Sequence, residues 1–277
     1  MKRIVATGDW HCGSRFGLAT PEYVSEKMRL RSDCLTMYER FCAYRDNVGP
    51  IDRLFLMGDL CDGWNPKEHA DDRTVEEKMQ VEMASELAKT FQGSPKIYAV
   101  DGSGYHRGTR RLDNAVAQAI NAIPSKYGRY ARPAVLLDVE GVRFSFAHMT
   151  TVSRSSWQYR TTPLALRLVL SRLSRLEREN HPYVLLRGHC HTFTYAGFKT
   201  QFAATVPAFQ TCTPFIEERS PENTCDVGFL FFQVEGDDYT WRPYVEGWMP
   251  EVVEDDGTQR SSDESVQGKR KQRTPRR

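Results

Sequence analysis

Aspartate and histidine side chains recur in this chain where short apolar runs end. They stand in Gly8-Asp9-Trp10-His11, Gly58-Asp59-Leu60-Cys61-Asp62, Gly104-Tyr105-His106, Ala147-His148 and Gly188-His189-Cys190-His191. Carboxylate oxygen and neutral imidazole nitrogen together suit Mn²⁺, iron, Zn²⁺ or Ni²⁺, whereas Mg²⁺ and Ca²⁺ prefer shells of oxygen alone. One ion needs fewer ligands than the six candidates, which are Asp9, His11, Asp59, His148, His189 and His191. The residues therefore predict a site for two divalent transition-metal ions that share a carboxylate, with Mn²⁺ as the preferred metal.

These side chains need a scaffold that brings several loops to one edge. Short apolar runs predict strands, and longer amphipathic stretches predict helices. We expect strands at 3–7, 53–57, 96–100, 135–138, 143–147, 183–187, 195–199 and 228–234, and helices at 21–46, 72–91, 110–121 and 163–180. The first half thus alternates strand and helix, which favours a mainly parallel sheet in an α/β fold. The carboxyl ends of such strands share one edge, where these folds place their sites.

The expected helix at 163–180 has an apolar and a basic side. Leu166, Leu170 and Leu173 are predicted to form its buried stripe. Its arginines are expected on a solvated face, with a nucleic-acid groove as the alternative; they are Arg167, Arg172, Arg175 and Arg178.

Composition excludes several classes of protein. The chain has 277 residues, of which 40% are apolar and 27% charged, as in globular domains. No apolar run approaches the ~20 residues of a membrane span, and the apolar start is too short for a signal peptide. The seven cysteines include no C-x-x-C pair, so neither a disulfide framework nor a zinc ribbon is indicated. We expect a cytoplasmic protein without membrane contact, in which Cys12, Cys61 and Cys190 point away from the metal ligands.

The chain changes character near its end. Acidic residues dominate from 251 to 264, and the last nine residues hold six bases and no acid. We therefore expect one domain over 1–250 and a disordered, acidic-then-basic tail over 251–277. The tail is expected to be solvated, with contact to nucleic acid as the alternative.

The five motifs, taken in order, resemble the calcineurin-like metallophosphoesterase family. D-x-H, G-D-x-x-D, G-x-H, a single histidine and G-H-x-H cover about residues 4–192. The resemblance implies a four-layer αββα sandwich of two mixed β-sheets, with a dinuclear metal site at strand ends. The form Gly-Ser-Gly-Tyr-His-Arg-Gly looks like the variants encoded by bacteriophages and prophages, which would place the protein in a bacterial host cytoplasm.

The resemblance also implies a role for each motif residue. Asp9, His11 and His191 match the ligands of one metal, Asp59 matches the bridging carboxylate, and His148 and His189 match ligands of the second metal. His106 matches the histidine that protonates the leaving group in catalysis, and Asp62 matches an acid that orients an imidazole. The family's reaction proceeds through a hydroxide that bridges the metals.

One position departs from the family pattern. The family has Gly-Asn-His-Asp/Glu, in which the asparagine binds the second metal, whereas this chain has Gly104-Tyr105-His106-Arg107. Either a tyrosine or Ser103 supplies the missing oxygen, or the second metal binds more weakly. The sequence leaves both alternatives open.

These features predict a metal-dependent phosphoesterase acting on a phosphoester substrate. Nucleic acid, DNA or RNA, is the first choice, because Arg107, Arg110 and Arg111 follow His106 and are candidate substrate-binding residues. Arg110 and Arg111 are expected in the first turn of a helix capped by Thr109, where cations oppose the helix dipole. A small phosphoester or nucleotide is the alternative substrate. A scaffold or binding module that has lost catalysis is the alternative class, and the oligomeric state is not indicated.

Overall fold

The computed structural model describes residues 1–24, 33–63, 75–107, 111–149, 161–173, 182–213 and 225–248. Its strands are β1 (Lys2–Thr7), β2 (Arg53–Leu56), β3 (Lys96–Val100), β4 (Ala131–Arg132), β5 (Val135–Val139), β6 (Val142–Ala147), β7 (Tyr183–Arg187), β8 (Tyr195–Phe198), β9 (Gln201–Thr205), β10 (Cys225–Glu235) and β11 (Asp238–Trp248). Its helices are a short 3₁₀ turn η1 (Pro21–Tyr23), then α1 (Asp33–Val48), α2 (Glu77–Lys89), α3 (Gly104–Arg107), α4 (Leu112–Ala119) and α5 (Thr162–Leu173).

The strands form two mixed sheets. The first has the order β11-β10-β1-β2-β3-β4, in which β1 to β4 are parallel and β10 runs antiparallel to β1. The second has the order β5-β6-β7-β9-β8, with a parallel centre and antiparallel edges. The β-α-β alternation of the first half therefore gives parallel strands, as expected.

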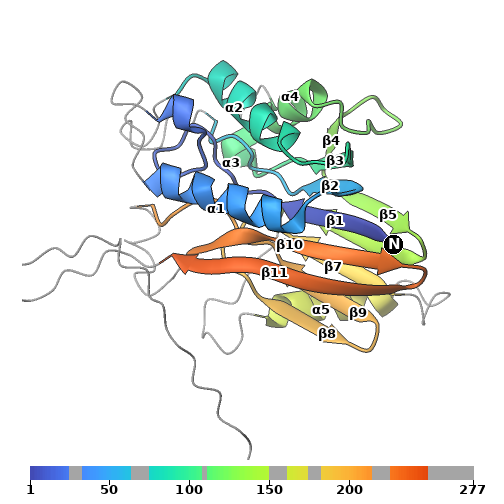
Figure 1. The fold of residues 1–277 in the computed structure, drawn as a ribbon. Helices are drawn as coiled ribbons and strands as arrows, with labels where there is room; N and C mark the ends of the chain where they lie inside the picture. Colours follow the sequence, from blue (N-terminus) through green and yellow to red (C-terminus); the bar gives the residue numbers. More distant parts are fainter. Residues whose placement is uncertain are drawn as a thin grey trace, which may run out of the picture.

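The alternation of side chains along β1 explains the layers. Val5 joins a core shared with α1, α2 and α4, whereas Ile4 and Ala6 point into a second core between the sheets. In that second core, Phe55 of β2 stacks on Phe146 of β6 with ring centroids 4.4 Å apart. Helix α5 covers the outer face of the second sheet, and Figure 1 shows it on the side opposite α1, α2 and α4. The expected four-layer αββα sandwich is confirmed.

All eight expected strands are present. The helix expected over 21–46 does not begin at residue 21, because 21–23 form only a 3₁₀ turn and Val24 is extended. Four elements of the described residues were not expected. These are β4, β9, β11 and α3. Strand β11 contains Pro243 and charged residues that weaken a strand pattern, but it lies at a sheet edge, where proline is tolerated. Helix α4 begins at Leu112 with Arg111 as its N-cap, so the expectation of a cap at Thr109 with Arg110 and Arg111 in the first turn is wrong.

The predicted buried stripe of α5 is also wrong. Leu166 and Leu170 are 56% and 54% exposed, whereas Leu164 and Leu168 are buried against β7 and β9. Leucine stands on both sides of this helix, so the periodicity alone does not choose the buried face. Arg167 is exposed, as predicted; the side chains of Leu173 and Arg172, and residues Arg175 and Arg178, lie outside the described residues.

Two further expectations concern the chain as a whole. Within the described ranges, no helix is long and apolar enough to cross a membrane. The division at residue 250 stays a prediction, and the expected tail at 251–277 lies outside the described residues.

The orientation of α5 predicts unequal effects for two leucines less than one helical turn apart. Leu168→Ala should lower the free energy of unfolding by about 2–5 kcal/mol, because it leaves a cavity against the second sheet. Leu170→Ala should change it by no more than about 0.5 kcal/mol, because its side chain is exposed. Urea unfolding of both variants measures this, and a larger effect at Leu170 would contradict the orientation.

Candidate metal centre

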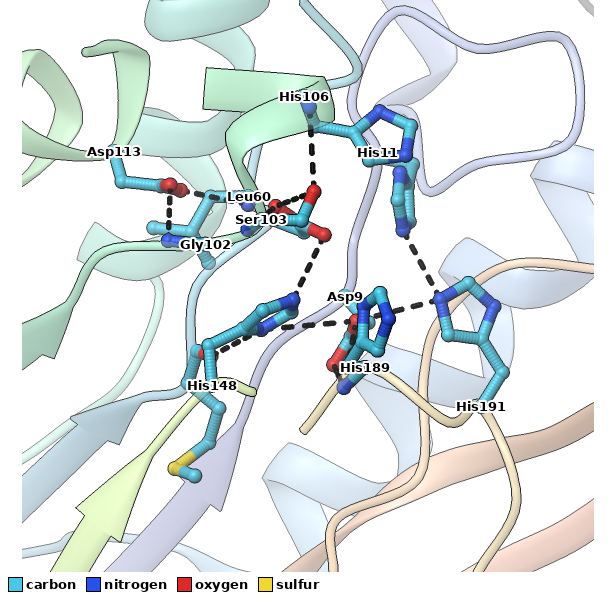
Figure 2. Close-up of polar contacts among 12 residues, drawn as sticks. Asp9, His11, Leu60, Gly102, Ser103, His106, Asp113, His148, His189 and His191 are labelled. Atoms are coloured by element: carbon cyan, nitrogen blue, oxygen red, sulfur yellow. Dashed lines mark hydrogen bonds and ion pairs between the residues drawn. The ribbon is translucent and has the colours of Figure 1, made fainter. Parts of the chain in front are cut away.

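The predicted ligands all follow the carboxyl ends of strands in the structure. The chains leaving β1 and β2 stay paired beyond the strands, because Asp9 N–H donates to the Gly58 carbonyl at 2.8 Å and His11 N–H donates to the Asp59 carbonyl at 3.0 Å. The segments after β3, β6 and β7 supply His106, His148, His189 and His191. Figure 2 shows the imidazoles of His11, His148, His189 and His191 gathered around Asp9. The structure thus brings the six predicted metal ligands to one edge.

Asp9, His11 and His191 form the first triad, and one donor atom from each lies within 4.8 Å of the others. His191 Nε2 is 3.3 Å from Asp9 Oδ1 and 3.2 Å from His11 Nε2. The Nδ1–H of His11 donates to Asp62 Oδ1 at 3.3 Å, which leaves the Nε2 lone pair facing His191. Two imidazole nitrogens and a carboxylate oxygen therefore converge at His191 Nε2.

Asp59, His148 and His189 form the second triad, again with donor atoms within 4.8 Å. The Nδ1–H of His148 donates to the Met57 carbonyl at 2.8 Å. His148 Nε2 then lies 2.9 Å from Asp59 Oδ2, at ion-pair distance but in no aligned hydrogen bond. A buried ring nitrogen fixed toward a carboxylate in this way is the arrangement that a metal ligand needs.

The Asp9 carboxylate joins the two triads. It accepts the backbone N–H of His189 at 3.1 Å and lies 4.0 Å from His148 Nδ1, while it also contacts His191. The two groups of ligands are therefore neighbours around one buried carboxylate. The bridging role expected of Asp59 stays a proposal.

Asp62 and His106 lie beside the first triad. Asp62 Oδ1 is 3.3 Å from His11 Nδ1 and 3.4 Å from His106 Nδ1. The Asp62 carbonyl accepts the Nδ1–H of His106 at 2.7 Å. The rings of His11 and His106 meet edge to face, with centroids 4.4 Å apart. One acidic residue thus orients both imidazoles, as expected from the motif.

The backbone of the site is strained. Five of the six predicted ligands have a positive φ; these are Asp9 (49°), His11 (46°), Asp59 (48°), His189 (77°) and His191 (51°). Left-handed conformations cost free energy in residues other than glycine and gather where function requires them. At Gly188, a Cβ would lie 2.8 Å from Asp9 Oδ2 and 3.0 Å from His148 Nδ1, so only glycine lets this loop approach the ligands.

Most of the buried ligands have the protonation state that a metal requires. Burial would raise the pKa of Asp59, but the charge of His148 outweighs burial and holds this pKa well below its usual range. Asp9 behaves in the same way, with His148 and His191 lowering its pKa. Burial and neighbouring imidazoles lower the pKa of both His11 and His189. These two histidines are therefore neutral, and the two carboxylates are ionised.

His148 and His106 differ from the other histidines. Burial alone would lower the pKa of His148, but the charges of Asp9 and Asp59 raise it to about 10. Burial opposes protonation of His106 as well, but its hydrogen bond to Asp62 and the charge of Asp59 raise its pKa to about 10. Without bound metal, both imidazoles are charged at neutral pH.

The two triads fit divalent transition metals. Each offers carboxylate oxygen and imidazole nitrogen, and its donor atoms lie within 4.8 Å of one another, little more than twice a metal–ligand bond of ~2.0–2.2 Å. His148 Nε2, which faces Asp59 Oδ2 at 2.9 Å, gives this fit a specific atom. The ligand types leave Mn²⁺, iron, Zn²⁺ and Ni²⁺ as candidates.

At the position that departs from the family pattern, the structure separates the two candidate oxygens. Tyr105 is 44% exposed, and its ring packs edge to face on His106. Ser103 is buried, and both its N–H (2.7 Å) and its hydroxyl (3.3 Å) donate to Asp59 Oδ1. Ser103 is therefore the residue that reaches the second triad.

The predicted substrate arginines are only partly described. Arg111 is exposed at the N-cap of α4, five residues after His106 in the sequence. Arg107 ends α3, but its side chain and residue Arg110 lie outside the described residues. Cys12 and Cys61 are buried in the core beneath the helices, as expected for packing residues, and Cys190 is half-buried.

Two buried side chains near the site were missed by the sequence reasoning. Gln80 of α2 accepts the Gly63 N–H at 2.8 Å, directly after Asp62. Asp113 of α4 accepts the N–H groups of Leu60 and Gly102. Burial and the nearby charge of Asp59 raise the pKa of Asp113 to about 6. Nothing in the sequence marks them, because polar residues on amphipathic helices are ordinarily solvated.

Comparison with known proteins gives only distant structural similarities. No protein-family model matches the chain, and no curated protein matches it. Among solved structures, Vps29 complexed with Zn²⁺ from Entamoeba histolytica is 10% identical with a TM-score of 0.43, covering 88% of this chain and 98% of that one. The phosphoesterase YfcE from E. coli is 14% identical (TM-score 0.43; 86% and 96% covered), and an archaeal phosphodiesterase is 11% identical (TM-score 0.44; 87% and 99% covered). At such scores we draw functional inferences from the site residues alone.

The protonated state of His148 predicts proton release on metal uptake. His148 must lose its proton to offer Nε2, so the apparent affinity for Mn²⁺ or Zn²⁺ should rise between about pH 6 and 8. In the metal-free protein, the raised pKa stabilises the fold fully below the ordinary value of 6.5, and this contribution is lost as the pH rises through about 10. Calorimetric titration in buffers of different ionisation enthalpy measures the released protons. An affinity independent of pH would contradict the prediction.

Proposed function

We propose that this protein is a metal-dependent phosphoesterase. The observation that carries the proposal is the pair of Asp/His triads joined by the Asp9 carboxylate at one sheet edge. When bound, two divalent ions would neutralise charge on a phosphoryl group and supply a nucleophile at neutral pH. The carboxylates of Asp9 and Asp59 and the four ligand histidines would hold these ions.

His106 is the general acid in this proposal. Its Nδ1–H is held by the Asp62 carbonyl at 2.7 Å, which directs the opposite nitrogen, Nε2, away from Asp62. Its raised pKa keeps a proton on Nε2 at neutral pH, where it is donated to the oxygen of the leaving group. Asp62 has two tasks, since it also orients His11 toward the first triad. No serine or cysteine nucleophile is required.

We propose phosphodiesters of nucleic acid as the substrate class. Arg111 supports this choice, because it is an exposed cation that follows His106 by five residues in the sequence. Arg107 and Arg110 lie between His106 and Arg111 in the sequence. The basic residues at 269–277 would add attraction to a polyanion. A small phosphoester or nucleotide remains the alternative substrate, since one or two phosphates would engage the same arginines.

Hydrolysis of bis(p-nitrophenyl) phosphate with added Mn²⁺ tests the proposed activity. Asp59→Asn should reduce turnover to background, because it removes the charged ligand of the second triad. Asp138→Asn is the matched control and should leave turnover unchanged. Asp138 lies on β5, outside the metal centre, and is paired with Arg143 of β6. If the protein binds Mn²⁺, Zn²⁺ or Ni²⁺ but hydrolyses no diester with any of them, the phosphodiesterase is contradicted, and a phosphomonoesterase of narrow specificity or a binding module is favoured.

The role of His106 predicts a loss of turnover without a loss of bound metal. His106→Asn should lower kcat by about 10²–10⁴-fold while both ions still bind, because a general acid contributes to turnover and not to metal affinity. Metal content by mass spectrometry and kcat on the same preparation measure the two effects. Equal loss of metal and turnover would instead make His106 a ligand.

Salt dependence distinguishes the two substrate classes. Binding to duplex DNA should weaken linearly in log[salt], and replacing Arg107, Arg110 and Arg111 by alanine should reduce the slope by about 0.9 for each phosphate that is no longer neutralised. Fluorescence anisotropy with Asp59→Asn as the background prevents cleavage, and Arg167→Ala on the exposed face of α5 is the control. If the affinity of the wild type for DNA does not depend on salt concentration, the proposal of a nucleic-acid substrate is overturned and the small phosphoester is favoured.

A further inference from the structure

Asp113 is a buried carboxylate that belongs to neither triad. It lies in the first turn of α4, and only 2% of the residue is exposed. Both of its oxygens accept backbone donors from other segments, Oδ1 from Leu60 N–H at 2.9 Å and Oδ2 from Gly102 N–H at 2.8 Å. Burying a carboxylate costs free energy unless it is paired and hydrogen-bonded. Asp113 therefore has a desolvation cost that an aspartate on the exposed surface of a helix would not have.

The two segments that Asp113 joins both lead to Asp59. Leu60 follows Asp59 in the loop after β2, and Gly102 precedes Ser103 in the segment after β3. Ser103 in turn donates its N–H and its hydroxyl to Asp59 Oδ1. Figure 2 shows Asp113 reaching Leu60 and Gly102 on the side of Ser103 that faces away from His148. The Asp113 carboxylate thus binds the residue next to Asp59 in one loop and the residue next to Ser103 in the other.

An ordinary helix cap does not explain this placement. The N-cap of α4 is Arg111 in the left-handed conformation, and no side-chain capping bond forms there. Both Asp113 oxygens are used by Leu60 and Gly102, which lie outside α4, 53 and 11 residues away in the sequence.

We infer that Asp113 is a positioning residue of the metal centre, which fixes the direction of the Asp59 carboxylate by clamping the Leu60 and Gly102 amides. Two backbone donors held by one rigid carboxylate set the spacing of the two loops. Ser103 then meets Asp59 Oδ1, and Oδ2 is left facing His148 Nε2 at 2.9 Å. The clamp stands on hydrogen bonds alone, whereas its effect on metal affinity rests on the proposed function.

Asn114, the next residue of α4, offers a matched control. Its Oδ1 accepts two backbone donors in the same manner, Tyr130 N–H at 2.9 Å and Ala131 N–H at 3.1 Å. These donors lead into β4, which pairs with the end of β3 and so supports the segment after β3, but neither bond reaches the loop after β2 that carries Asp59 and Leu60. Loss of either clamp should loosen the protein near α4, but only loss of the Asp113 clamp should directly release the loop that carries Asp59.

Asp113→Asn tests the clamp with little change of shape. The amide keeps one acceptor and sets an N–H against one of the two backbone donors, which leaves that donor unpaired. Hydrogen exchange followed by mass spectrometry should show about tenfold or faster exchange in peptides covering 57–63 and 100–106, because a buried hydrogen bond is removed. Asn114→Ala should accelerate exchange near residues 129–132 and leave the 57–63 peptide as in the wild type, so the 57–63 peptide distinguishes the two variants.

Metal binding provides the second readout. In a Co²⁺ titration followed by visible absorption, Asp113→Asn should weaken binding of the ion at the second triad by about 10- to 100-fold. Asn114→Ala should bind both ions as the wild type does. Equal behaviour of the two variants, in exchange and in Co²⁺ affinity, would overturn the inference.

The two proposals fail in different ways. If the wild type binds no ion, the proposed function fails, and the exchange measurement alone decides whether Asp113 holds the loops at Asp59. If Asp113→Asn does not fold, Asp113→Ser, which removes the long acceptor without placing an amide against the backbone, is compared with Asn114→Ala in the same two measurements. Unchanged exchange at 57–63 and 100–106 in that variant would also overturn the clamp.

Discussion

The approach of buried carboxylates and imidazole nitrogens at Asp9 and Asp59 is the constraint on which the rest of the structure depends. Both carboxylates are removed from water, and an isolated buried charge is costly. The surrounding imidazoles offset part of this cost, yet His148 Nε2 lies 2.9 Å from Asp59 without an aligned hydrogen bond. Divalent cations would displace the proton of His148 and neutralise both carboxylates, so the local geometry fits metal binding.

The fold supplies what this approach requires. Two sheets packed through Phe55 and Phe146 bring the ends of β1, β2 and β3 next to those of β6 and β7. Beyond the strands, the loops are held by backbone pairing, by Gly188 and by buried polar side chains such as Asp62 and Asp113. Left-handed backbone at five of six ligands shows that this packing overrides local preference.

The sequence predicts the parts of this account that follow from motif order and strand pattern. Asp9, Asp59 and His148 each end an apolar run, so their meeting at one edge follows from the parallel connection of strands. The orientation of α5 was not predictable, because leucine stands on both of its sides and contact with β7 and β9 decides which side is buried. Asp113 was missed for a related reason, since a polar residue in a first helical turn looks like an ordinary cap until long-range contacts are known.

Anomalous diffraction from crystals of the protein grown with Mn²⁺ tests the central claim most directly. We expect two peaks about 3.5–4 Å apart. One peak should be bounded by Asp9, His11 and His191, and the other by Asp59, His148 and His189. A single peak, or peaks away from these residues, would contradict a dinuclear metal centre in this protein.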